Sequence, residues 1–151
     1  MSLANASQDA PARGKLAELW IYPIKSCAGL RVPQARLLAT GLQWDRHWML
    51  VDPQGRFVTQ RTLPRMAHVH MAFIGAAGDG SGGDDGDGGA AQMQVRMADR
   101  PQLAPLAIAL AVPTQAPRLR VQVWKSEVDA IDEGDAAAQW FSQALGQPGL
   151  G

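Results

Sequence analysis

Apolar residues alternate with other residues in short runs over most of the chain, and a helical spacing replaces this alternation only near the C-terminus. Alternation is typical of β-strands, whereas apolar positions three and four residues apart are typical of a helix. The runs predict strands at residues 15–22, 31–39, 46–52, 56–60, 67–74, 92–98, 106–112, 119–123 and 127–131. The pattern therefore predicts a mainly β fold, a small antiparallel β-barrel or rolled sheet with one C-terminal helix.

Two local signals predict where elements turn or end. Residues 52–55, Asp-Pro-Gln-Gly, carry Asp, Pro and Gly at the positions that a type I turn favours, which predicts a hairpin between 46–52 and 56–60. Asp135 is predicted to be the N-cap of the helix, and Gly146 is predicted to end it.

A length of 151 residues fits one domain, which we assign to residues 15–146. We expect residues 1–14 to be a disordered tail. Residues 147–151 are expected to begin a linker. No apolar run approaches the roughly 20 residues that cross a bilayer. The single cysteine, Cys27, has no partner for an internal disulfide, which excludes a disulfide-stapled secreted scaffold and favours a cytoplasmic location.

Residues 75–89 contain eight glycines and four aspartates, too little apolar surface to order the segment. We therefore expect a mobile loop there. The aspartates invite comparison with a calcium loop, but counting from Asp85 places Gly89 and Arg96 where an EF-hand needs oxygen ligands. The sequence thus predicts no metal site.

The formal net charge is zero, which excludes nucleic-acid binding by bulk charge. The charge is nevertheless uneven along the chain. Nine basic and four acidic side chains precede residue 75, whereas five basic and ten acidic side chains follow from there. Residues that bind an anion are therefore expected in the first half.

Lys25 and Ser26 lie in a predicted turn after the first strand, and Arg46 lies at the entry to the predicted hairpin. A lysine, a hydroxyl group and an arginine are the donors that a phosphate group needs. Lys25, Ser26 and Arg46 therefore form our candidate anion site. The alternative, on spacing alone, is that Lys25 and Arg46 are ordinary surface charges.

Other residues with chemical potential have structural interpretations. Cys27 follows Lys25 closely enough to suggest a reactive thiol, but packing as a small apolar residue is the favoured interpretation. His68 and His70 share a strand face without an evident third metal ligand, so solvent-facing positions are favoured. Most of the five tryptophans are expected in the core. We predict no catalytic residue in this chain.

Several motifs stand in order along the chain: residues 19–27 (LWIYPIKSC), 41–42 (GL), 45–46 (DR), 48–49 (WM), then Thr59, Arg61 and Pro64. A later segment, 132–146, carries Asp132, Gly134-Asp135, residues 137–140 (AAQW) and Leu145-Gly146. Together these motifs resemble the N-terminal β-barrel domain of the MOSC proteins, from about residue 15 to residue 146.

The resemblance implies a part in a molybdenum-cofactor enzyme that reduces N-hydroxylated compounds. It implies that Lys25, Ser26 and Arg46 meet the phosphate of the pterin cofactor, and that the molybdenum-ligating cysteine belongs to a C-terminal MOSC domain. The implied partners are that domain and an electron-donor domain or protein, and the chain alone is expected to be inactive. The alternative is a non-catalytic β-barrel module that binds a protein or a small anion.

Overall fold

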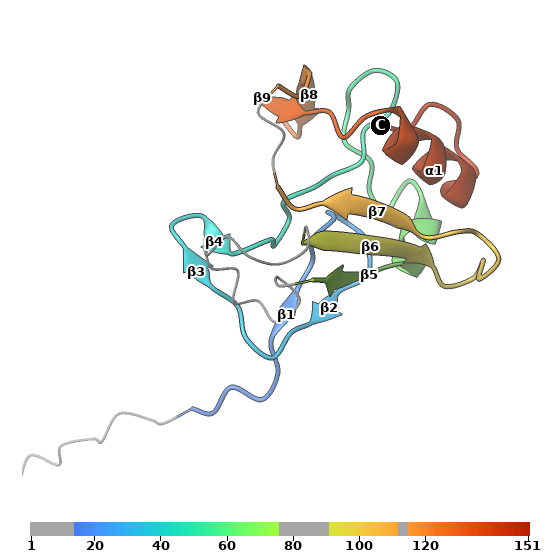
Figure 1. The fold of residues 1–151 in the computed structure, drawn as a ribbon. Helices are drawn as coiled ribbons and strands as arrows, with labels where there is room; N and C mark the ends of the chain where they lie inside the picture. The colour runs from blue at the N-terminus through green and yellow to red at the C-terminus, as the bar shows by residue number, and fades with distance from the viewer. Residues whose placement is uncertain (1–13, 76–90, 112–114) are drawn as a thin grey trace, which may run out of the picture.

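The structure is a computed structural model that describes residues 14–75, 91–111 and 115–151. It is mainly β, with antiparallel sheets and one C-terminal helix, as predicted (Figure 1). The sheets pair β1 (Trp20–Ile21) with β2 (Leu30–Arg31), β3 (Leu37–Leu38) with β4 (Gly41–Leu42), β5 (Val69–Ile74) with β6 (Gln92–Met97) and β7 (Leu106–Ala109), and β8 (Arg118–Val123) with β9 (Ser126–Ile131).

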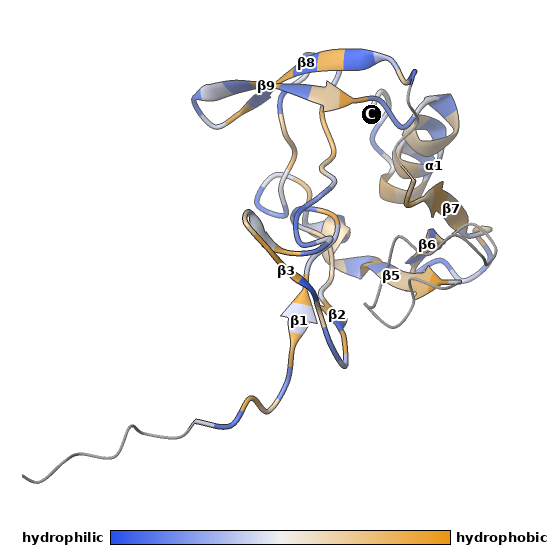
Figure 2. Ribbon diagram, turned by 60° about the vertical axis from the view of Figure 1, so that its left-hand side comes forward, coloured by the Kyte–Doolittle hydropathy of each residue, from blue (hydrophilic) through white to orange (hydrophobic). Residues whose placement is uncertain are grey.

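The strands in the described ranges do not close into a barrel. The order β5-β6-β7 ends at β7, and β8 and β9 form a separate two-stranded sheet. In both views the β8–β9 hairpin lies apart from the three-stranded sheet, and α1 (Asp135–Leu145) lies on the side of β7 (Figures 1 and 2). The expectation of a barrel or rolled sheet therefore stays a prediction.

The early strands are shorter than the alternation suggests. In the run 15–22 only Trp20–Ile21 pairs with another strand. The predicted strand 31–39 is divided between β2 and β3 with Pro33 between them, as expected of a residue that lacks a backbone donor.

The predicted turn at 52–55 is confirmed, although its flanks are not regular strands. The Gly55 amide donates to the Asp52 carbonyl at 2.8 Å, and the Asp52 carboxylate accepts the amides of Gln54 and Arg56, each at 2.9 Å. Beyond the turn, Val51 and Phe57 form a single antiparallel bridge. The side chains of residues 52–55 thus determine the turn, but the flanking strands predicted at 46–52 and 56–60 do not form.

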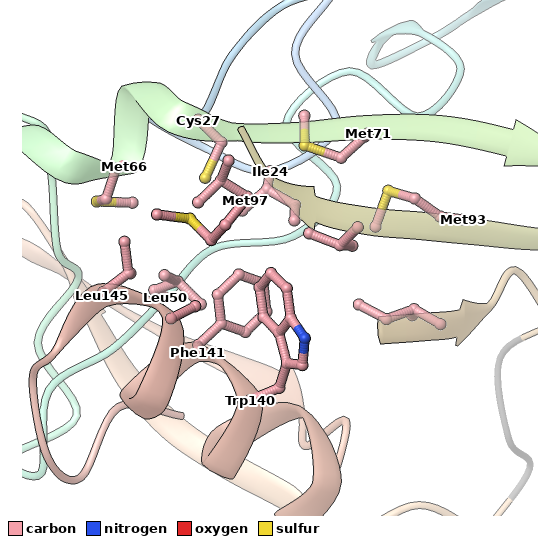
Figure 3. Close-up of a cluster of buried hydrophobic side chains, with 14 of the residues drawn as sticks. Ile24, Cys27, Leu50, Met66, Met71, Met93, Met97, Trp140, Phe141 and Leu145 are labelled. Atoms are coloured by element: carbon pink, nitrogen blue, oxygen red, sulfur yellow. The ribbon is translucent and has the colours of Figure 1, made fainter. Parts of the chain in front are cut away.

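The core lies between the three-stranded sheet and α1 (Figure 3). Trp140 and Phe141 of α1 pack edge to face, with ring centroids 5.0 Å apart, and point toward the methionines of the sheet side. The buried methionines are Met66, Met71, Met93 and Met97. The Trp140 indole N–H donates to the Ala104 carbonyl at 2.7 Å, so the burial of this polar group is compensated.

The helix is confirmed, and so is its end at Gly146, but the predicted N-cap is wrong. Gly134, not Asp135, is the N-cap, and Asp135 is the first helical residue, where its charge is favourable. Gly146 ends the helix in the left-handed conformation at φ 69°, as predicted. A 3₁₀ helix, η1 (Pro64–His68), precedes β5 and was not predicted from the alternation.

Residues 147–151 pack against the domain. Leu150 is buried, and its amide donates to the Ser142 hydroxyl at 3.0 Å. Val51 and Gly151 exchange backbone hydrogen bonds of 2.8 and 3.0 Å. Gly149, at φ 77°, lies against the ring of Pro53.

The predicted tail and the predicted mobile loop lie outside the described residues, apart from Gly14 and Gly75. In the part of the chain that the structure describes, no helix has the length and apolar character needed to cross a membrane.

Candidate anion-binding site

Lys25 lies in a tight turn after β1 that two buried residues, Pro23 and Ile24, anchor to the core. Ile24 forms a parallel bridge with Trp48, and the Lys25 amide donates to the Trp48 carbonyl at 2.8 Å. Ser26, which is half-buried, follows with a left-handed backbone at φ 65°. The backbone of the turn is thereby fixed against the segment that contains Trp48.

That segment, residues 44–48, carries Arg46. The Arg46 amide donates to the Tyr22 carbonyl at 2.8 Å, and the Trp48 amide donates to the Pro23 carbonyl at 3.0 Å. Arg46 also has a left-handed backbone, at φ 51°. Two segments that are about 20 residues apart in the sequence are therefore laid side by side by backbone hydrogen bonds.

Lys25 and Arg46 line the same cavity, which has a volume of about 580 Å³. Ser26 belongs to the same turn but does not line the cavity. Burial lowers the pKa of Lys25 below its ordinary value, and the nearby charge of Arg46 lowers it further. The two cations repel each other, so an anion bound near both would be stabilised by both.

Aromatic rings lie against both cations. The Lys25 ammonium nitrogen is 4.0 Å from the ring centroid of Phe57 and 5.4 Å from that of Trp124. The guanidinium carbon of Arg46 is 5.4 Å from the ring centroid of Tyr22. These distances are typical of cation–π contacts, which hold a cation without using its hydrogen-bond donors on an acceptor.

Asp45 is the acidic neighbour of the site. Its carboxylate pairs with Nη1 of Arg46, whose side chain is 60% exposed. A guanidinium group has five N–H donors in a fixed fork, so pairing at one nitrogen leaves donors for a ligand. Asp45 therefore orients Arg46 and also competes with an anion for its charge.

Acidic residues of β9 and of the segment between β9 and α1 also line the cavity. They are Asp129, Asp132 and Glu133, and Glu133 accepts a hydrogen bond from the Trp48 indole N–H at 2.7 Å. This hydrogen bond connects the segment that carries Arg46 with the segment between β9 and α1. The cavity lining thus contains three cations, Lys25, Arg46 and Arg118, and three carboxylates, and is otherwise largely apolar.

His47 also lines the cavity, and its ring packs edge to face against Trp44 and Trp48, with centroids 5.0 and 4.6 Å away. Burial lowers the pKa of His47, and the charge of Glu133 partly opposes this effect. Burial thus disfavours the protonated form of His47 relative to a free imidazole.

The described residues contain no group of three or more histidine, cysteine, aspartate or glutamate side chains that could hold a metal ion. Cys27 is buried in the core cluster, and burial raises its pKa to about 12, as expected of a packing residue rather than a nucleophile. His68 and His70 are exposed, as predicted.

Sequence reasoning missed the surroundings of Lys25. The tryptophans are divided: Trp140 is buried, Trp44 and Trp48 are half-buried against the core, and Trp20 and Trp124 are exposed. The expectation that most would be core is therefore right for three and wrong for two. The available signal was the position of Trp124 between the predicted strands 119–123 and 127–131, because a residue in a short connection between strands is usually exposed.

Three comparisons with known proteins bear on this geometry. Residues 13–148 match the family described as the MOSC N-terminal beta barrel domain. The chain is 33% identical over 141 residues to a molybdenum cofactor sulfurase of Drosophila grimshawi, covering 91% of this chain and 16% of that protein. It is 32% identical over 136 residues to mitochondrial amidoxime-reducing component 1 of Mus musculus, covering 87% of this chain and 35% of that protein.

A solution structure of a protein from Bordetella bronchiseptica has a similar fold, with a TM-score of 0.52. Its sequence is 18% identical, and the similarity covers 87% of this chain and 83% of that one. The similarity extends over most of both chains and concerns the fold alone.

The chain thus spans about a sixth of the sulfurase and about a third of the amidoxime-reducing component. The family match, in contrast, extends over nearly the whole chain and includes the segments that carry Lys25 and Arg46. The chain belongs to the MOSC N-terminal beta barrel domain family.

Proposed function

We propose that this chain is the cofactor-side domain of a molybdenum-cofactor-dependent oxidoreductase that reduces N-hydroxylated compounds. In this proposal Lys25, Ser26 and Arg46 bind the phosphate of the pterin cofactor, and the domain helps to shape the substrate pocket. The observation that carries the proposal is that Lys25 and Arg46 line one cavity. The names of the relatives, a molybdenum cofactor sulfurase and an amidoxime-reducing component, support it.

The side chains fit a phosphate group. Lys25 supplies three N–H donors and a positive charge, Arg46 supplies a forked guanidinium, and Ser26 supplies a hydroxyl in the same turn. When bound, the molybdenum of the cofactor would supply the oxygen and electron transfer of the reduction. The work of these residues is to bind and orient the phosphate end.

The metal end of the cofactor needs groups that the described residues do not offer. Cys27 is buried in the core with a raised pKa, so it has no thiolate to present to a metal. We therefore propose that a C-terminal MOSC domain of the whole protein supplies the thiolate and that a separate domain or protein supplies electrons. We further propose a cytoplasmic location and no turnover by this chain alone.

The test is made in the full-length protein that contains this domain. Lys25→Ala and Arg46→Ala should each weaken cofactor binding by about ten- to a hundredfold, because each removes a charge-assisted hydrogen bond. The melting temperature should hardly change, because neither side chain is in the core cluster. Lys15→Ala and Arg36→Ala, which change exposed residues outside the cavity, are the matched controls. Full cofactor in both site variants, or loss only through unfolding, would contradict the proposal.

A non-catalytic module that binds a small anion is the second candidate, because the cation pair alone suffices for anion binding. The two candidates differ in what the native protein contains. Mass and metal analysis of the full-length native protein distinguishes them, since only the oxidoreductase carries molybdenum and pterin.

A further inference from the structure

We propose that Phe57 and Trp124 form an aromatic clamp that positions the Lys25 ammonium group, which makes the β8–β9 hairpin a working part of the anion site. This inference rests on the proposed function, because it assigns a role to residues that act through Lys25. Phe57 and Trp124 are positioning residues, and neither lines the cavity that Lys25 and Arg46 share. The rings therefore support the cation from outside the cavity.

The clamp is assembled from segments that are far apart in the sequence. Trp124 lies in the two-residue turn of the β8–β9 hairpin, beside the Val123–Ser126 pair. One strand residue, Gln122, attaches the hairpin: its amide donates to the Gly55 carbonyl at 2.8 Å, and its carbonyl accepts the Phe57 amide at 3.1 Å.

The two rings then meet each other and the lysine. The centroids of Phe57 and Trp124 are 4.8 Å apart, with 55° between the ring planes. The Lys25 nitrogen is closer to Phe57, at 4.0 Å, than to Trp124, at 5.4 Å. Phe57 is thus the main contact, and Trp124 is the outer one.

The backbone conformation at Trp124 is an independent observation. In the described part of the chain, four non-glycine residues have positive φ: Ser26, Trp44, Arg46 and Trp124. Three of them lie next to Lys25 in sequence or in space. Left-handed backbone is costly for a residue with a Cβ and gathers at functional sites.

Core packing does not account for the side chain at position 124, because Trp124 is 64% exposed. A glycine would satisfy the turn at lower cost. The indole instead covers Phe57 and approaches Lys25. We therefore assign to this exposed tryptophan the role of positioning Lys25.

A clamp of this kind aids anion binding through entropy. A free lysine side chain must lose rotamer freedom when it binds a phosphate oxygen, and this loss weakens binding. Rings that already hold the ammonium reduce this loss, and N–H groups that do not face a ring stay available as donors to a phosphate. We therefore expect the aromatic contact to strengthen phosphate binding without touching the phosphate.

The first measurement needs no ligand. The ε-methylene protons of Lys25, followed by NMR in this chain, should be shifted upfield by the ring currents of Phe57 and Trp124. Trp124→Leu and Phe57→Leu should each move these signals toward ordinary lysine values, and Trp124→Phe should keep part of the shift. Trp20→Leu, which removes another exposed tryptophan, is the control and should leave the signals unchanged.

The second measurement is the affinity for inorganic pyrophosphate, with melting temperatures recorded for every variant. We expect Trp124→Leu to weaken binding by about two- to fivefold, and Trp124→Phe to restore most of it. In a Lys25→Ala background, Trp124→Leu should have no further effect on affinity, because the tryptophan acts only through the lysine.

Each outcome decides something. Unchanged Lys25 signals in both leucine variants, or an equal loss of affinity with and without Lys25, would overturn the clamp. If Lys25→Ala does not weaken pyrophosphate binding, the proposed anion site is refuted. The ring-current measurement would still test whether Phe57 and Trp124 hold Lys25. Folded variants are expected because Trp124 is exposed, and Trp124→Phe serves if the leucine variant loses its fold.

Discussion

The carboxylate of Asp45 accepts the backbone amide of Tyr22 at 2.7 Å, across 23 residues of sequence, and the same carboxylate pairs with Arg46. One oxygen therefore fixes the loop against Tyr22, the residue after β1, and the other pairs with the guanidinium group. Substitution can separate the two roles, because an amide side chain keeps an acceptor oxygen but carries no charge.

We predict that Asp45→Asn strengthens pyrophosphate binding by about two- to fivefold, because it removes the negative charge that competes for Arg46. Asp45→Ala should also lower the free energy of unfolding, by about 0.5–1.5 kcal/mol, because the Tyr22 amide loses its acceptor. Titration calorimetry and urea denaturation measure the two effects. Weaker pyrophosphate binding in Asp45→Asn would contradict the assigned competition.

The lowered pKa of His47 predicts a pH-dependent stability. The unfolded chain binds a proton at the ordinary histidine pKa of 6.5, whereas the folded chain binds it only at lower pH. The contribution of His47 to the free energy of unfolding is therefore fully present above pH 6.5. It is lost as the pH falls through 6.5 toward the pKa of the folded state. Melting temperatures between pH 5 and 7.5 should fall on acidification, and His47→Gln should flatten this slope. Aspartates with lowered pKa, such as Asp52, lose their contribution below this window.

Cys27 should resist thiol reagents while the chain is folded. With a pKa of about 12, roughly one molecule in ten thousand carries the thiolate at pH 8, and the side chain is 2% exposed. Iodoacetamide labelling should therefore follow unfolding and become fast only in denaturant. Complete labelling of the folded protein within minutes would show that the thiol is accessible and activated.

Substitution of two glycines near the C-terminus distinguishes the cost of a strained backbone from the cost of a steric clash. Gly146→Ala should cost about 1–2 kcal/mol, since φ is 69° and the nearest atom to a new Cβ would be 3.9 Å away. Gly149→Ala should cost more, because φ is 77° and a Cβ there would lie 2.8 Å from Cγ of Pro53. Urea denaturation of both variants tests the order, and equal losses would exclude the clash with Pro53.

The features that the sequence predicted well are those that depend on a few neighbouring residues. The turn at 52–55 and the helix end at Gly146 follow from local chemistry that no distant contact overrides. The strands β5 and β6 fall within the long alternating runs predicted at 67–74 and 92–98. The early strands were overestimated because alternation cannot tell a paired residue from an extended one, as residues 15–19 illustrate.

The candidate site was predictable in part. Lys25 and Arg46 were grouped because phosphate needs cations and because their motifs resemble a known family, and the fold does bring them to one cavity. Phe57 and Trp124 could not be found in this way, since their contact with Lys25 depends on how a distant hairpin attaches. Glu133 was missed for the same reason, because its hydrogen bond to Trp48 spans 85 residues.

The attachment of the hairpin through Gln122 also has a consequence for folding order. The β8–β9 hairpin closes through a two-residue turn, an event that takes about 1–10 μs in isolated hairpins. Its docking on Gly55 and Phe57 instead closes a loop of more than 60 residues, so it must come later. An intermediate with a finished but undocked hairpin would present Lys25 without Trp124. Pyrophosphate affinity, followed during refolding, would therefore report when the hairpin has docked.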